Sequence, residues 1–505
     1  MSRTRKSGKN FLFGTAFQAV TIGANLAIRV AFLRILGTEY LGLSEFFLST
    51  VALLSLTEMG AGVAFGYFLY APLAVRDEVR IAKLLNFYRS VYRMIAIGTL
   101  VLGAALAPVM FAVVNTEIGA AEFFLAYAVF VVDACITYLF AHKRTLIAAD
   151  QNQWVVSAYA TGATLARLAF QFAVLYAFPQ FVLYVLVQLL TNLLQNAAIS
   201  NRANRAYPFI VERRSVRLDK QEVAELRKYM WAMVMHRVGA TAARSTDNLV
   251  LGIAVGVSQV AYLANYRLVI AAVERPVLQL YSAMAASIGN LGATATRERS
   301  YSAFRAVFVM NAWVGIVCSV GLATLLNEFI DLWLGSEYVL SQGLVLILAV
   351  NFLFQIMRQS TNTFKTSWGL FWNDRFRPLA EAVVNVGASL LLVGPLGIGG
   401  VLIGTSVGFV LVNMWTEPYV LYRYGFGRQL REYFVGFASV VAGAAVLYVI
   451  VTLLMSLLPN DGGFWRLLVA ASICLATTNG ALLLALGRTR EFATLYGWAS
   501  SLWRR

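Results

Sequence analysis

Long apolar stretches recur along almost the whole of this 505-residue chain. A membrane-spanning helix needs about 20 predominantly apolar residues. Segments of that kind lie at approximately 11–36, 42–70, 88–113, 122–141, 153–178, 181–201, 229–256, 261–290, 302–326, 339–358, 376–394, 398–420, 433–457 and 464–486. Because 59% of the residues are hydrophobic and only 13% are charged, we expect an all-α polytopic membrane protein with about 14 transmembrane helices.

The basic residues between these spans predict the orientation of the chain. The 41 Lys and Arg residues avoid every second connection, and eight of them gather in the segment 201–228. Cytoplasmic loops of membrane proteins carry such an excess of positive charge. We therefore expect a multi-pass protein with both termini in the cytoplasm, and a retained first helix behind the basic start MSRTRKSGKN.

A weak internal repeat divides the chain. Three landmarks recur 219, 222 and 216 residues apart, namely Gly37 with Gly256, Lys143 with Lys365, and Pro179 with Pro395. Such spacing predicts two six-helix lobes related by a pseudo-two-fold axis normal to the membrane. The expected parts are an N-lobe over 1–200, a cytoplasmic linker over 201–228, a C-lobe over 229–422, two further helices over 423–486 and an interfacial tail over 487–505.

Four arginines interrupt the apolar spans near their middle: Arg29, Arg167, Arg244 and Arg275. An arginine at the centre of a membrane helix costs roughly 2.5 to 3.5 kcal/mol on insertion scales. Such residues need compensation from partner side chains, from water or from a ligand. A polar, positively charged cavity within the membrane would supply it.

Helical periodicity indicates which polar residues share a face with these arginines. The candidate faces hold Gln18, Asn25 and Arg29; Thr164, Arg167 and Gln171; Arg237, Thr241, Arg244 and Asn248; and Arg267, Glu274 and Arg275. The acids counted inside the spans are fewer, namely Glu58, Asp133, Asp247 and Glu274. Arginines and acids can pair as buried bridges between helices, but the surplus positive charge predicts an anionic substrate. The planar guanidinium fork suits a phosphate or diphosphate.

Phrases in the second half resemble a known family. They are STDNLVLGIAVGVSQVAYLANYRLVI, ASIGNLGA, IDLWLGSEYVL, WGLFWNDRFRPLAEAVVNVGASLLLVGPLGIGGVLIGT and WTEPYVLYRYGF, with RILGTEYLGL and YAPLA in the first half. The chain resembles Wzx-type polysaccharide flippases of the multidrug/oligosaccharidyl-lipid/polysaccharide (MOP) superfamily. The resemblance implies a V-shaped, two-lobed, monomeric transporter of the bacterial cytoplasmic membrane.

By this resemblance the protein is not an enzyme and uses no cofactor. It would move an undecaprenyl-diphosphate-linked oligosaccharide to the outer leaflet by alternating access, for synthesis of a cell-surface polysaccharide such as capsule, exopolysaccharide, O-antigen or a wall glycan. Its partners would be membrane lipids and polymerase machinery, and no nucleic acid. Family members hold the headgroup with basic residues of a central cavity. In this chain those residues would be Arg29, Arg167, Arg237, Arg244, Arg267 and Arg275, with Gln18, Asn25 and Asn248 beside them.

Some relatives couple transport to Na⁺ or H⁺. Related lipid II flippases use acids and amides on helices 7, 11 and 12, and Asp247, Glu381, Asn385 and Thr405 occupy comparable places here. Oxygen ligands of that kind suit a hard cation. The alternative is that Asp247 bridges a neighbouring arginine and Asn385 packs between helices.

The sequence leaves three alternative functions. A lipid II flippase has the same implied fold and an anionic headgroup, and it is the main alternative. A drug exporter of the same superfamily would have an acidic cavity, of the opposite sign. A polysaccharide-assembly enzyme would need a sizeable external loop, but none here exceeds about 13 residues, and His142 and His236 show no catalytic or metal-binding spacing. Cys135, Cys318 and Cys474 lie far apart and predict neither a disulfide framework nor a metal cluster.

Overall fold

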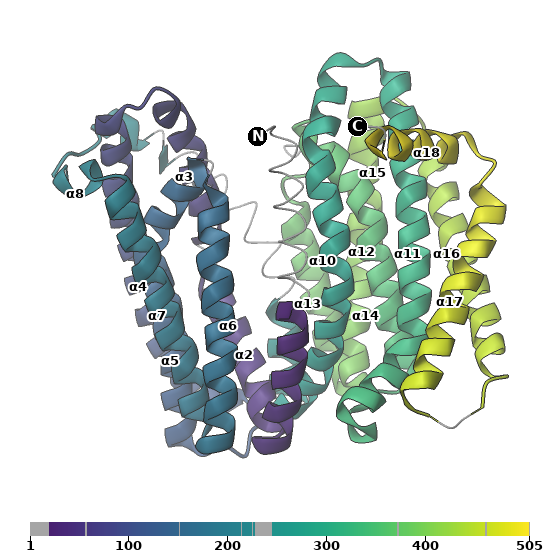
Figure 1. Ribbon diagram of the computed structural model, residues 1–505, viewed down its shortest axis with the longest axis horizontal. Coiled ribbons are helices and arrows are strands. Elements are labelled where there is room, and N and C mark those ends of the chain that lie inside the picture. Colours follow the sequence, from purple (N-terminus) through teal and green to yellow (C-terminus); the bar gives the residue numbers. More distant parts are fainter. Residues whose placement is uncertain are drawn as a thin grey trace. The chain divides into compact units, whose positions relative to one another are not determined.

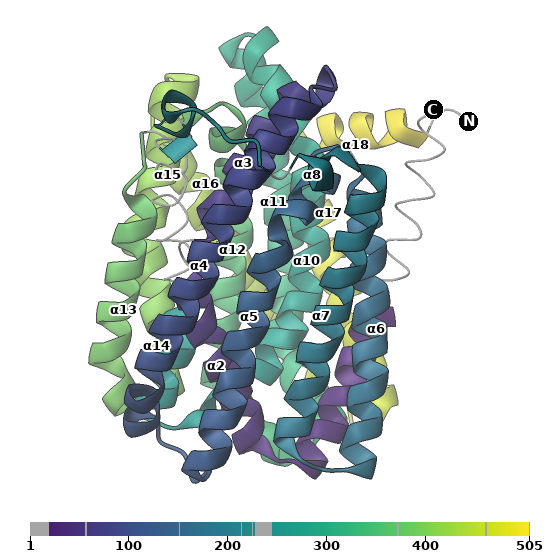
Figure 2. The same cartoon turned by 90° about the vertical axis from the view of Figure 1, so that its left-hand side faces the viewer.

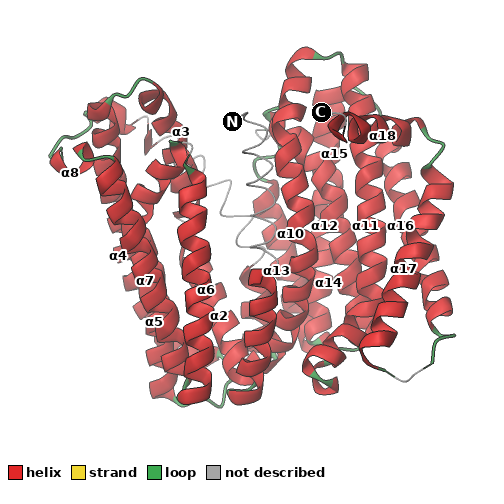
Figure 3. Ribbon diagram, viewed as in Figure 1, coloured by secondary structure: helices red, strands yellow, loops and turns green. Residues whose placement is uncertain are grey.

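The computed structural model of the protein describes residues 20–55, 58–150, 152–213, 215–224, 226–227, 245–370, 373–459 and 462–503. Helices follow one another along this part of the chain, joined by short turns, and it contains no strand (Figure 3). The protein is therefore an all-α polytopic membrane protein, as predicted.

The chain forms two compact units, Met1–Ala261 and Tyr262–Arg505. The first contains helical residues 20–35 and 245–254, α2 (Thr38–Leu54), α3 (Glu58–Ala74), α4 (Glu78–Val113), α5 (Ala120–Ala149), α6 (Gln153–Ala177), α7 (Phe181–Ala206) and the short α8 (Phe209–Glu212). Within this unit α4 packs on α5, α5 on α7, and α7 on α6 (Figure 2).

The helix α10 (Val257–Thr294) starts in the first unit and continues into the second. The second unit then contains α11 (Arg297–Leu334), η2 (Ser336–Tyr338), α12 (Gln342–Ser367), α13 (Arg377–Leu396), α14 (Ile398–Gly408), η4 (Phe409–Asn413), α15 (Met414–Val420), η5 (Leu421–Phe426), α16 (Arg431–Met455), α17 (Gly463–Leu486) and α18 (Arg490–Trp503). Of these, α11 packs against α12, α16, α17 and α18 (Figure 1).

Nine helical segments in the described part of the chain are long and apolar enough to cross a membrane: α4, α5, α7, α11, α12, α13, the run from Ile398 to Phe426, α16 and α17. Each of the fourteen predicted spans overlaps helical residues. The predicted stretch 42–70 corresponds to parts of two helices, α2 and α3.

Several helices are longer than the apolar stretches that predicted them. The helix α4 starts at Glu78 rather than at 88, and α12 ends at Ser367 rather than at 358. The apolar length reflects the thickness of the bilayer, while the helix continues through polar turns outside it. The start of α4 is fixed by Asp77, whose side chain accepts a hydrogen bond from the Arg80 backbone N–H at 2.9 Å.

The division between the units falls after the predicted linker 201–228. Residues 245–261 pack on the first unit, where Gly42 lies against the Val257 carbonyl with no space for a side-chain carbon. In addition, the backbone N–H of Val257 donates to the Asn115 carbonyl at 3.4 Å. The arrangement as two six-helix lobes with a symmetry axis stays a prediction.

Candidate functional site

Arg29 lies on the first helix of the first unit, one turn after Asn25. Its Nη2 atom is 3.3 Å from Glu45 Oε1 of α2. Its Nη1 atom is buried and has no hydrogen-bond acceptor in the part of the chain that the structure describes. Asn25 donates to the Thr21 carbonyl at 2.7 Å. Arg29 is therefore anchored on one side only, by an acid that the sequence analysis did not count.

Arg167 on α6 has a neutral partner. Its Nη1 atom donates to Gln188 Oε1 of α7 at 3.4 Å. The Gln188 amide donates in turn to Asp133 Oδ2 at 3.2 Å, and Asn192 donates to Asp133 Oδ1 at 2.6 Å. Both oxygens of Asp133 are thus bound to amide groups, and Arg167 reaches this carboxylate only through Gln188.

Arg29 and Arg167 both lie within electrostatic range of the hydroxyl group of Tyr184 on α7, as does Glu45. Each guanidinium carries five N–H donors, and the described residues offer each of the two a single acceptor. Most donors of this pair are consequently free to bind the oxygens of an anion, and such charge-assisted bonds are strong where water is scarce.

The other predicted substrate-binding residues are spread over both units or are not described. In the first unit Asn248 donates to Ser49 Oγ at 3.0 Å, Thr164 donates to the Ala160 carbonyl at 2.8 Å, and the fully buried Gln171 donates to the Tyr184 carbonyl at 3.2 Å. On α10 of the second unit, Arg267 and Glu274 are half-buried and Arg275 is exposed. Gln18, Arg237, Thr241 and Arg244 lie outside the described residues.

The residues predicted to bind a cation belong to both units. Asp247 is buried in the first unit, whereas the other three belong to the second. Glu381 Oε2 is 3.1 Å from Arg377 Nη1, and Glu381 Oε1 is 3.7 Å from Arg358 Nη1. Asn385 accepts from Ser389 at 3.1 Å, and Thr405 donates to the Val401 carbonyl at 3.3 Å. The described residues contain no group of three His, Cys, Asp or Glu side chains placed to hold a metal ion.

Sequence analysis missed a buried network of charges in the second unit, which we call the ionic cluster. It consists of Arg358, Lys365, Asp374, Arg377, Glu381, Asn413 and Glu417. Glu417 is at its centre: Arg358 Nε lies 2.9 Å from its Oε2 atom, Arg377 Nη1 3.2 Å from its Oε1, and Lys365 Nζ 3.6 Å from its Oε1. Lys365 and Arg377 also pair with Asp374, and Arg377 donates to Asn413 Oδ1 at 2.7 Å.

The positive and negative charges of the ionic cluster balance one another. Three cations face three carboxylates, and Lys365, Asp374 and Glu417 are at most 3% exposed in their side chains. In such clusters the cost of desolvation offsets much of the Coulomb attraction, so that their main effect is to fix one packing arrangement. The ionic cluster joins the end of α12, the start of α13 and α15, and we assign it to the architecture of this unit.

A signal for the ionic cluster exists in the sequence. Arg358 and Glu417 lie at or near the ends of predicted spans. Asp374 precedes another predicted span, and Arg377 is the second residue of that span. Opposite charges at the same end of neighbouring membrane helices often pair. Their mutual distances depend on the π-helical stretches η4 and η5 on either side of α15, which shift the helical register and which periodicity does not reveal.

Comparisons with known proteins identify the fold. No protein family model matches the sequence, and no curated protein matches it. Among solved structures, the lipid II flippase MurJ in an inward closed conformation matches with a TM-score of 0.67 at 10% identity, covering 94% of this chain and 100% of that one. An inward-facing multidrug resistance MATE family transporter of the MOP superfamily matches with a TM-score of 0.65 at 14% identity, covering 79% and 93%.

A third structure, a MATE protein in a bent conformation, matches with a TM-score of 0.54 at 13% identity and covers 85% of this chain and 95% of that one. The chain therefore has the fold of these three solved structures. At such low identity the likeness describes the fold and leaves the substrate open.

Proposed function

We propose that this protein is a flippase that moves an undecaprenyl-diphosphate-linked oligosaccharide from the cytoplasmic to the outer leaflet of a bacterial cytoplasmic membrane. The observation that carries the proposal is that two guanidinium groups inside the first unit, those of Arg29 and Arg167, each have a single acceptor among the described residues. A diphosphate offers several oxygens to such donors. The likeness in fold to a lipid II flippase supports the same class of substrate.

The physics of the substrate favours this mechanism. A polyprenyl diphosphate cannot carry its charged head through hydrocarbon unaided, but its tail never has to leave the bilayer. The protein has only to solvate the head. Moving about two negative charges outward is favoured by an inside-negative potential by roughly 4 to 5 kcal/mol at 100 mV. Coupling to Na⁺ or H⁺ through Asp247, Glu381, Asn385 and Thr405 stays a prediction, and Glu381 is already paired with two arginines.

A lipid II flippase is the second candidate, because MurJ has the same fold and lipid II also carries a diphosphate. A drug exporter of the MATE kind is less well supported. Cationic drugs would be repelled by Arg29 and Arg167. A polysaccharide-assembly enzyme is the least supported, since two solved structures with this fold are described as a transporter and a flippase.

Mass spectrometry of the lipid-linked intermediates that accumulate on depletion of the protein tests the proposal. We expect a complete undecaprenyl-diphosphate oligosaccharide to accumulate, and the unmodified chain to reverse the accumulation. The Arg29→Gln variant should fail to reverse it, while Arg34→Gln, an exposed arginine of the same helix, should succeed. Accumulation of lipid II would favour the second candidate, and no accumulation of a diphosphate-linked lipid would contradict both.

A further inference from the structure

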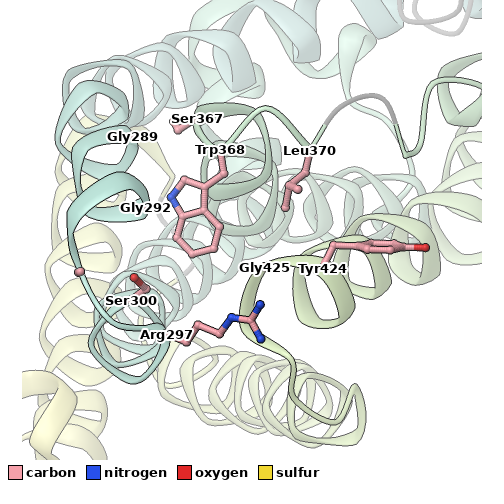
Figure 4. A pocket seen from close by; sticks show the side chains of 10 residues that line it. Gly289, Gly292, Arg297, Ser300, Ser367, Trp368, Leu370, Tyr424 and Gly425 are labelled. Carbon is pink, nitrogen blue, oxygen red and sulfur yellow. The ribbon is translucent and has the colours of Figure 1, made fainter.

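A basic pocket lies in the second unit, apart from Arg29 and Arg167, the residues proposed to act in transport. Its volume is about 410 Å³, and it is bordered by the end of α10, the start of α11, the residues after α12 and the end of η5 (Figure 4). These chain segments lie in connections that the positive-inside rule assigns to the cytoplasm. The pocket is therefore expected at the level of the inner-leaflet headgroups.

Arg297 provides the charge of this pocket. It is the first residue of α11, and Figure 4 shows its guanidinium and the Trp368 indole extending into the same space. In the described part of the chain Arg297 has no ion pair, whereas nearby Arg305 pairs with Glu491 at 2.9 Å and Arg428 with Glu432 at 3.8 Å. No acidic residue is among the described residues that line the pocket. Its net charge is thus positive.

Ser300 adds a buried polar group. The residue is only 3% exposed and lines the pocket, and its hydroxyl makes no hydrogen bond to the described residues. A hydroxyl that lines a pocket without a protein partner is available to a ligand or to water. The first N–H groups of α11 also favour an anion at this end of the helix. The Thr296 side chain caps only one of them, the Arg299 N–H, at 3.4 Å.

The wall of the pocket is rigid and aromatic. Gly292 lies so close to the Trp368 indole that it has no space for a side-chain carbon, and a carbon added at Gly425 would lie 2.8 Å from the ring on another side. The indole Nε1 donates to the Ile288 carbonyl at 3.0 Å, so this group is already satisfied. The indole thus serves as a fixed apolar surface beside the cation, suited to the glycerol part of a headgroup.

We propose that this pocket binds the phosphate ester of an anionic phospholipid from the inner leaflet, with Arg297 and Ser300 as ligands to the phosphate oxygens. Cytoplasmic membrane surfaces attract basic sites of this kind, and arginine binds phosphate in a forked, charge-assisted geometry. The site is independent of the proposed transport function. Its occupancy can be measured without any transport assay.

Binding of dihexanoyl phosphatidylglycerol to the full-length protein in detergent tests this site, with dihexanoyl phosphatidylcholine and inorganic phosphate as comparison probes. We expect phosphatidylglycerol to bind, and Arg297→Gln to weaken its binding about tenfold. Ser300→Ala should weaken it a few-fold. The matched control is Arg299→Gln, an exposed arginine of the same helical turn that does not line the pocket.

Three results would overturn the inference. Equal binding of phosphatidylcholine and phosphatidylglycerol would exclude a site for an anion. An equal loss of phosphatidylglycerol binding in Arg299→Gln and Arg297→Gln would show that surface charge alone attracts the lipid. Binding of inorganic phosphate as tight as that of the short lipid, with the same dependence on Arg297, would assign the site to free phosphate instead of a lipid. Arg297 is exposed, and a thermal unfolding scan of each variant verifies that the protein is folded.

Discussion

The arginines inside the two units of this protein differ in how completely their donors are used. In the second unit, Arg377 contacts oxygens of Asp374, Glu381, Asn413 and Glu417. In the first unit, Arg167 contacts one neutral amide. An arginine bound to several carboxylates of neighbouring helices fixes those helices against one another, whereas an arginine with one neutral partner keeps most of its donors for a ligand. The number of N–H donors that neighbouring residues bind therefore distinguishes a structural arginine from a ligand-binding one better than its position in the membrane does.

The largest effect should follow the loss of an acid from the ionic cluster. Glu417→Gln leaves Arg358, Lys365 and Arg377 with two carboxylates, in a site where Glu417 is 1% exposed. We expect a loss of about 3 to 5 kcal/mol in the free energy of unfolding, measured by chemical or thermal denaturation in detergent. Glu78→Gln, which removes an exposed pair with Arg213 at 3.7 Å, should cost less than about 1 kcal/mol. Equal losses would refute the distinction between the two kinds of pair.

In the first unit we expect the opposite result, a small effect on stability and a large effect on ligand binding. Arg167→Gln removes one bond to a neutral amide, so the unfolding temperature should change little. Binding of an undecaprenyl-diphosphate lipid should weaken about tenfold or more, because charge-assisted bonds to the diphosphate are lost. Lipid binding in nanodiscs and a thermal scan of the same sample measure both quantities. A large loss of stability with unchanged lipid binding would make Arg167 a structural residue.

Glu45 offers a sharper test, since it is the only described acid bonded to Arg29. If the diphosphate and Glu45 compete for this guanidinium, then Glu45→Gln should tighten binding of the anionic headgroup a few-fold, at a modest cost in stability because both side chains are partly exposed. Titration with the diphosphate lipid measures the change. Weaker binding in Glu45→Gln would mean that the acid orients Arg29 for the ligand instead of competing.

A smaller effect on stability than at Glu417 is expected at the end of α7 in the first unit. There the Tyr207 hydroxyl donates to Asp150 Oδ2 at 2.6 Å. Burial, then the hydrogen bond to Asp150, raises the pKa of Tyr207 above its ordinary value near 10. Because the pKa is raised in the folded state, the stabilising contribution is complete below pH 10 and is lost as the pH rises beyond it.

Tyr207→Phe should therefore cost about 1 kcal/mol in the free energy of unfolding. This cost should be constant from pH 6 to 9 and should shrink above pH 10. Denaturation of both proteins across this pH range measures it. A cost that changes between pH 6 and 9 would show that another titrating group controls this contact.

Much of the fold could be predicted from the sequence, because the thickness of the bilayer imposes a length on apolar segments that no other environment requires. The predicted span 153–178 matches α6 to within one residue, and 464–486 matches α17 equally well. The predicted start of α4 and the predicted end of α12 were wrong by ten and nine residues, because hydrophobicity reports the thickness of the membrane and not the end of the helix. The apolar stretch 42–70 was predicted as one span, whereas it covers parts of two helices, α2 and α3.

Less of the candidate site could be predicted. Periodicity placed Asn25 and Arg29 on one helix, but it could not reveal that Glu45 of α2 reaches Arg29, because Glu45 lies near the start of its span and was not counted as an acid within the membrane. Nor could it reveal that Gln188 separates Arg167 from Asp133. Contacts between helices depend on rotation and register, which a single sequence does not specify.

The central claim is that Arg29 and Arg167 bind the diphosphate of a lipid that the protein moves between leaflets. Proteoliposomes containing the full-length chain and an undecaprenyl-diphosphate oligosaccharide test it directly, through the rate at which an enzyme outside the vesicle gains access to the sugar. We predict rapid access with the unmodified chain and with Arg34→Gln, and access at the protein-free rate with the double variant Arg29→Gln, Arg167→Gln. Undiminished transport by a folded double variant would contradict the account.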